Sequence, residues 1–94
     1  MLLLPATITL HDSRDTLRLL AQALQGEKEG EVIVDASPLQ QFDTSALAVL
    51  LECRRLAQAF GRPFSVRNAP HKLTALADLY GVGELLLTPE PGAA

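Results

Sequence analysis

Three β-branched residues in a row, Val32-Ile33-Val34, constrain the fold of this 94-residue chain more than any other feature. A continuous β-branched run is typical of a central strand that is covered on both faces. Apolar residues at helical spacing lie before it (residues 17–24) and after it (residues 44–60). A buried strand between two helices predicts a parallel sheet, because parallel strands are usually joined by a helical crossover.

Shorter patterns extend this unit in both directions. The alternation in Ala6–Leu10 predicts a strand with one solvated face, and residues 64–67 predict another strand. A third helix is expected from Pro70 to Gly81, whereas Leu85–Leu87 fits a last strand or a helix equally well.

The predicted fold class is therefore α/β, with a mostly parallel four-stranded sheet and helices packed against it. Residues 1–87 form the one domain, and residues 88–94, with two prolines and a glycine, form a flexible tail. The residues expected to face inward from the three helices are Leu17, Leu20, Ala21, Leu24, Ala46, Val49, Leu50, Cys53, Leu56, Ala57, Phe60, Leu73, Leu76, Ala77 and Tyr80.

Composition excludes several classes of function. The net charge is −3, and the eight Lys and Arg residues are scattered, which argues against a nucleic-acid partner. A single cysteine, Cys53, cannot form an internal disulfide and is interpreted as core filler. The longest apolar run, Ala46–Leu51, is too short to span a membrane, and the opening MLLLP lacks the features of a signal peptide. We therefore expect a soluble cytoplasmic protein.

The polar residues do not predict an enzyme. His11 lies in a turn and His71 in the first turn of a helix, and neither has a nucleophile placed beside it. Asp35 and Asp43 suggest an acidic pair, but Asp35 is better explained by bonds to the backbone of the turn that follows it. There is no Gly-rich phosphate loop. We predict no catalytic residue, no metal and no cofactor.

The helix that starts near Thr44 carries more apolar surface than packing on a sheet requires. A helical wheel places Leu47, Ala48 and Leu51 away from the inward stripe, and Thr44 and Arg55 on the same side as Leu51. The favoured interpretation is a docking face for another protein, since such faces combine apolar anchors with a charged rim. The alternative is that a neighbouring helix or loop of the same domain covers these leucines.

Three polar residues open this helix, and they allow two interpretations. Asp43, Thr44 and Ser45 are all residue types that cap free backbone N–H groups. Alternatively, Thr44 or Ser45 is a phosphorylation site, where a phosphate would add negative charge beside Asp43 and switch binding.

The run VDASPLQQFDTSAL at residues 34–47 resembles the signature of STAS domains, which occur in sulfate transporters and anti-sigma factor antagonists. In that family an apolar strand ends in Asp, a Ser follows two residues later, and a loop leads to an Asp-Ser/Thr-Ser/Gly-Gly helix start. Asp35, Ser37 and Asp43 keep this spacing, and the resemblance covers residues 31–87. It implies a STAS-type single domain.

Within the family, Leu73–Leu86 is most similar to the small STAS subunits of the Mla (toluene-tolerance type) phospholipid-transport ABC complexes of Gram-negative bacteria. That resemblance implies a cytoplasmic accessory subunit that binds the ABC transporter ATPase subunit, lies peripheral to the inner membrane through this partner, and helps to maintain outer-membrane lipid asymmetry. Thr44 matches the contact threonine of those subunits. Ser45 matches the phosphorylated serine of anti-sigma factor antagonists, so the alternative partner is an anti-sigma factor kinase.

The sequence departs from the family pattern in two places. Ala46 stands where the family usually has Gly, which narrows the room for a partner backbone. The chain also begins close to its first helix, so the usual first strand is expected to be missing or reduced.

Overall fold

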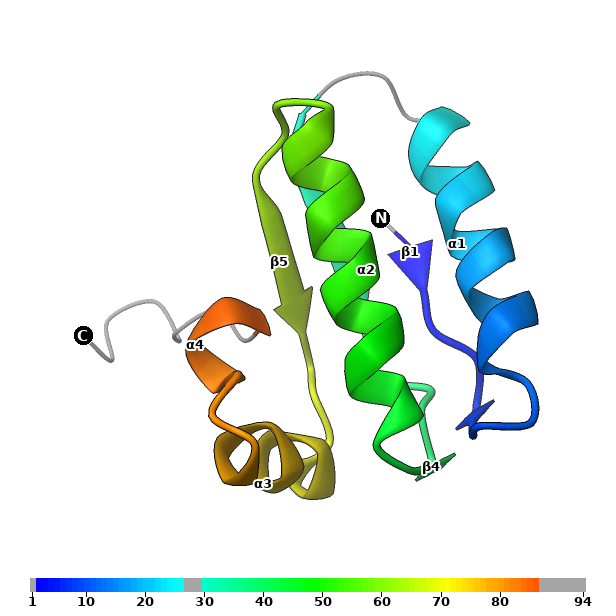
Figure 1. Ribbon diagram of the computed structural model, residues 1–94, viewed down its shortest axis with the longest axis vertical. Coiled ribbons are helices and arrows are strands. Elements are labelled where there is room, and N and C mark those ends of the chain that lie inside the picture. The colour runs from blue at the N-terminus through cyan, green and yellow to red at the C-terminus, as the bar shows by residue number, and fades with distance from the viewer. Residues whose placement is uncertain (1, 27–29, 87–94) are drawn as a thin grey trace.

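The computed structural model describes residues 2–26 and 30–86, and within them the chain forms five short strands and four helices (Figure 1). In chain order these are β1 (Leu2–Leu3), β2 (Thr7–Ile8), α1 (Ser13–Gly26), β3 (Val32–Asp35), β4 (Gln41–Phe42), α2 (Ser45–Ala59), β5 (Phe64–Arg67), α3 (His71–Leu79) and α4 (Gly83–Leu86). The predicted tail, residues 88–94, lies outside the described residues.

The strands pair in parallel throughout, which confirms the predicted α/β class. Strands β1, β3 and β5 form one sheet with β3 in the centre, as the β-branched run predicts. Strands β2 and β4 form a separate parallel pair. In the main sheet Val34 lies between Leu2 of β1 and Val66 of β5.

One face of the main sheet is covered by α1 and α2, which lie side by side in front of it (Figure 1). Val32, Val34 and Val66 point to this face and are buried. The opposite face is covered only in part, because Leu3 is 63% exposed and Ile33 is half-buried. The prediction that both faces of the central strand are covered is therefore wrong for this second face.

The N-terminal segment differs in detail from the predicted strand over Ala6–Leu10. Only Thr7 and Ile8 form β2, and Pro5 separates them from β1, which supplies a two-residue strand ahead of them. At the other end, Leu85 and Leu86 belong to the short helix α4, so the helical alternative holds for these two residues. Leu87 lies outside the described residues.

Helices α2 and α3 end in the same way. Gly61 and Gly81 follow the last residues of these helices with φ of 68° and 72°, a conformation that glycine adopts without a steric cost. The next N–H groups turn back onto the helices, Arg62 to Ala57 and Val82 to Ala77, each at 2.9 Å. The predicted stop signals are thus confirmed.

Two aromatic residues predicted to face inward are exposed instead. Phe60 and Tyr80 are the C-cap residues of α2 and α3, and each is more than half exposed. The helical wheel fails there because a C-cap residue begins to leave the helical path, and none of the described elements covers these two rings.

A buried arginine that the sequence reading did not single out joins distant parts of the chain. The Arg62 Nε donates to the carbonyl of Gly30 at 2.8 Å, and its Nη1 donates to the carbonyl of Leu24 at 3.2 Å. These bonds tie the last turn of α1 and the start of β3 to the segment that leads into β5.

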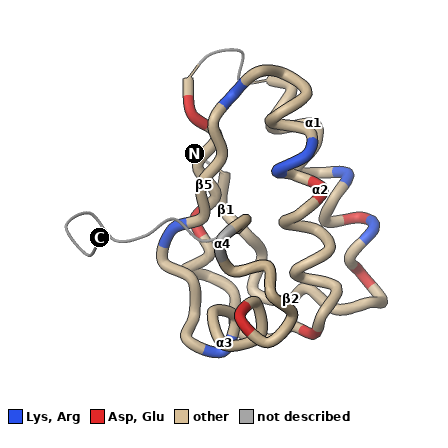
Figure 2. The backbone as a smooth tube through the Cα atoms, turned by 60° about the vertical axis from the view of Figure 1, so that its left-hand side comes forward, with Lys and Arg blue, Asp and Glu red and all other residues tan. Residues whose placement is uncertain are grey.

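Charged residues of both signs are interspersed over the fold, as Figure 2 shows. Within the described ranges, every helix is too short or too polar to cross a bilayer.

Candidate functional site

The start of α2 is held by Asp43, the residue that precedes its N-cap. The Asp43 Oδ1 accepts a hydrogen bond from the Ser45 backbone N–H at 2.9 Å and another from the Ser45 hydroxyl. Its Oδ2 accepts from the backbone N–H of Leu10 at 3.0 Å, in the loop between β2 and α1. The hydrogen bonds from Ser45, and then that from Leu10, hold the pKa of the Asp43 carboxyl below its usual value. One carboxylate therefore caps α2 and links it to a second loop.

The other two members of the predicted capping trio behave differently. Thr44 is the N-cap residue by position, yet its hydroxyl makes no capping hydrogen bond and its side chain is exposed. Ser45 is only 9% exposed, and its hydroxyl donates to Asp43. The capping interpretation is confirmed for Asp43 and wrong for Thr44, which leaves Thr44 as the accessible hydroxyl at this helix start.

Leu47 does not lie on an exposed face, and the prediction that it does is wrong. Its side chain is 5% exposed and belongs to the core, and Leu51 is half-buried against the same core. Helix α1 packs alongside α2 (Figure 1), so α2 has more covered surface than packing on the sheet alone would give it. The alternative, that a neighbouring helix or loop of the same domain covers these leucines, holds for Leu47.

What remains exposed on α2 is a narrower stripe. Thr44, Ala48 and Arg55 are exposed, and the half-buried Leu51 lies between the last two. These four positions are spaced at i, i+4, i+7 and i+11, so they follow one side of the helix. The Arg55 Nε donates to Glu52 Oε1 at 2.9 Å, which holds the guanidinium against the helix surface. We call these four residues the α2 stripe.

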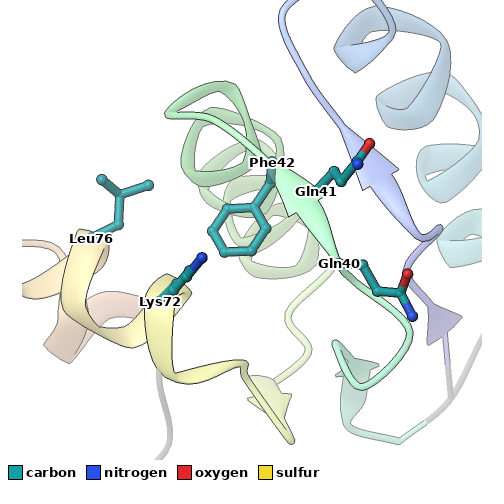
Figure 3. A pocket seen from close by; sticks show the side chains of 5 residues that line it. All are labelled: Gln40, Gln41, Phe42, Lys72 and Leu76. Carbon is teal, nitrogen blue, oxygen red and sulfur yellow. The ribbon is translucent and has the colours of Figure 1, made fainter.

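A depression that the sequence did not reveal opens beside this helix start, between β4 and α3. It has a volume of about 440 Å³ and is lined by Gln40, Gln41, Phe42, Lys72 and Leu76. The Phe42 ring and the Lys72 ammonium point toward each other across it (Figure 3). Phe42 directly precedes Asp43, so the same short segment supplies both the helix cap and one wall of the depression. We call this feature the β4–α3 depression.

The residues considered for chemistry are held by local contacts. Asp35 Oδ1 accepts from the Ser37 backbone N–H at 2.9 Å and from Asn68 Nδ2 at 3.2 Å, as predicted for its turn. These bonds, chiefly that from the Ser37 backbone, lower the pKa of Asp35. Burial, and then the nearby Glu52 charge, raises the pKa of Cys53 to about 12, so its thiol is unreactive core filler.

Metal-binding side chains do not gather in the described part of the chain, where no three His, Cys, Asp or Glu residues form a group that could hold an ion. The arrangement at the start of α2 is instead a rigid corner with one free hydroxyl and an exposed stripe. Such a corner can present a surface to another protein.

Comparison with known proteins agrees with this arrangement. The family model described as "Mlab, STAS domain" matches residues 2–88, which include every described strand and helix. No curated protein matches the chain. STAS domains are generally small, non-catalytic binding domains with a regulatory or accessory role. With both the sheet and the Asp43 corner inside the matched range, the chain belongs to the STAS domain family.

Proposed function

We propose that this protein is a non-catalytic accessory subunit that binds the ATPase of a phospholipid ABC transporter and thereby helps to maintain outer-membrane lipid asymmetry. The partner is a cytoplasmic ATPase subunit, so the protein reaches the inner membrane only through this complex. The description of the matching family model, which names Mlab, supports this partner over others.

The observation that carries the proposal is the exposed α2 stripe beside a braced helix start. The Asp43 carboxylate accepts from the first backbone N–H of α2, that of Ser45, so the Thr44 hydroxyl is not needed as a cap and is available to a partner. Ala48, one turn further along, has a small side chain that lets a partner approach the helix closely. Arg55 supplies a charged rim at the far end.

The alternative function is that of an anti-sigma factor antagonist switched by a kinase. Its regulatory hydroxyl would be that of Ser45, which is buried and already donates to Asp43. A kinase would have to break that contact and open the helix start before it reached the oxygen. The geometry therefore favours the transporter over the kinase as the partner.

The experiment uses two matched substitutions on different helices. Ala48→Arg places a long cation on the α2 stripe, and Ala23→Arg places the same side chain at an exposed position of α1, outside that stripe. Each variant is mixed with the purified ATPase subunit of the host's phospholipid transporter, and its affinity is measured by calorimetry.

We expect Ala48→Arg to weaken binding by about 30-fold, the loss typical of disrupting a buried contact at an interface centre, and Ala23→Arg to change it by less than about twofold. Equal affinities for wild type and Ala48→Arg, with the folds intact, would place the docking surface elsewhere. Failure to bind the ATPase, together with binding to an anti-sigma factor kinase, would replace the proposed function by the alternative.

A further inference from the structure

The β4–α3 depression shares no residue with the α2 stripe, and its lining combines apolar, charged and amide side chains. Phe42 and Leu76 are half-buried apolar side chains that face it from β4 and from α3. Lys72 contributes an exposed ammonium that points toward the Phe42 ring (Figure 3). The side chains of Gln40 and Gln41 extend away from α3 in that view.

Lys72 is an exposed positive charge beside this apolar surface. Among the residues that the structure describes, it has no ion-pair partner, whereas Arg55 pairs with Glu52 and Arg62 donates to two carbonyls. The complement of a cation beside apolar side chains is a carboxylate flanked by an apolar group, because the carboxylate pairs with the ammonium while the apolar group packs against Phe42 and Leu76. The charge of the depression thus specifies the chemistry of what it binds.

The backbone of β4 specifies the shape of the ligand. Within the described residues β4 pairs only with β2, and it does so through the N–H groups of Gln41 and Asp43. Alternate residues of a strand direct their backbone groups to opposite edges, so the N–H and C=O of Phe42 face away from β2. A free strand edge beside an apolar surface is suited to an added extended segment.

The same face of α3 continues beyond the depression. Leu79 lies seven residues after Lys72 and three after Leu76, and it is 78% exposed. The apolar surface beside Lys72 therefore extends along α3 beyond the depression.

We propose that the β4–α3 depression binds an extended peptide segment of a partner protein in which an acidic residue lies next to an apolar one. The carboxylate bonds to the Lys72 ammonium, the apolar side chain packs between Phe42 and Leu76, and the main chain pairs with Phe42. This inference goes beyond the proposed function and holds for any partner that carries such a segment.

To test this proposal, peptide ligands are selected from a random library, so that no partner protein has to be known in advance. Random heptapeptides displayed on phage are selected against the full-length immobilised protein, and the most enriched sequence is synthesised with a fluorescent label. We expect the enriched sequences to carry Asp or Glu beside an apolar residue. Affinity of the synthetic peptide, and of its Asp→Asn or Glu→Gln counterpart, is then measured by fluorescence anisotropy.

Two protein variants with the same change of charge locate the site. Lys72→Glu reverses the cation in the depression, and Arg18→Glu reverses an exposed cation on α1. We expect Lys72→Glu to bind the peptide at least tenfold more weakly than wild type, and Arg18→Glu to bind within about twofold. A peptide in which Lys replaces the acidic residue should prefer Lys72→Glu over wild type, a reversal that loss of folding cannot produce.

The inference is overturned if the selection yields no enrichment, if the enriched peptides carry no acidic residue, or if Lys72→Glu binds them as wild type does. The peptide assay uses no ATPase, so a negative result in it does not bear on the Ala48→Arg experiment. The two proposals can therefore be rejected independently.

Discussion

Helices α2 and α3 both follow a parallel strand and both end at a glycine, yet they differ sharply in how the domain covers them. Seven of the fifteen residues of α2 are buried, including Leu47 and Leu50. Only Leu73 and Ala77 are buried among the nine residues of α3, which lies across one end of the molecule (Figure 1). Helix α2 is thus part of the core with one exposed stripe, whereas α3 buries two apolar residues and leaves Ala75 and Leu79 exposed.

This difference teaches that apolar content alone does not locate a binding surface. The surplus leucines of α2 were predicted to be the docking anchors, but Leu47 is buried in the core and Leu51 is half-buried against it. Exposed leucines lie in other parts of the molecule, and Leu79 on α3 is one of them. The same residue type stabilises the fold on one helix and is available for contact on the other.

Thiol reactivity compares the two helices within one molecule. In a Leu79→Cys variant, one thiol lies on α3 and the native Cys53 lies in α2. The pKa of Cys53 is raised to about 12 by burial and then by Glu52, so its thiolate fraction at pH 8 is on the order of a thousandfold below that of an exposed cysteine. We expect a disulfide reagent to label the thiol introduced at position 79 quickly and to label Cys53 only after unfolding. Rapid labelling of Cys53 in the native wild type would show that α2 is not held in the core.

Leucine truncation gives the next largest contrast. Leu50→Ala removes a fully buried side chain from α2 and is expected to cost about 2–5 kcal/mol in the free energy of unfolding. Leu79→Ala removes a solvated side chain from α3 and is expected to cost less than about 0.5 kcal/mol. Urea denaturation measures both. Comparable losses would mean that α3 is as much a part of the core as α2.

A smaller effect is expected at the braced start of α2. Asp43→Asn keeps the size of the side chain but leaves one oxygen where two now accept, so either the Ser45 or the Leu10 N–H loses its acceptor. The melting temperature should fall at neutral pH, while circular dichroism shows the same helix content.

The pH dependence of this effect has a definite sign. The folded-state pKa of Asp43 is depressed, so its contribution to stability is fully present above the unfolded value of about 3.9 and is lost as pH falls through the folded value. The difference in melting temperature between wild type and Asp43→Asn should therefore be constant from pH 7 to pH 5 and shrink below about pH 4. A difference that stays constant down to pH 2 would exclude the ionised carboxylate as its source.

Much of the fold follows from the sequence alone. The β-branched run predicts the central strand, the glycines after residues 60 and 80 predict the helix ends, and the STAS resemblance predicts the family. Each of these depends on residues close together in the chain, where backbone preferences act directly.

The candidate site was predicted less well, because its features depend on contacts between distant segments. A wheel drawn for α2 contains no information about α1, so it cannot show that Leu47 is covered. Likewise, nothing near Phe42 in the sequence indicates that Lys72 and Leu76 lie opposite it. Only the packing of α3 against the end of the sheet brings the three together.

The Arg62 bonds to Leu24 and Gly30 bear on the order in which the domain opens. One side chain joins the last turn of α1 to the segment between α2 and β5, and these regions are 38 residues apart along the chain. A local fluctuation that frays α1 must therefore break bonds that also hold the entrance to β5. We expect the backbone amides of both regions to exchange their hydrogens as one cooperative unit, although short, solvated helix ends ordinarily exchange first and alone.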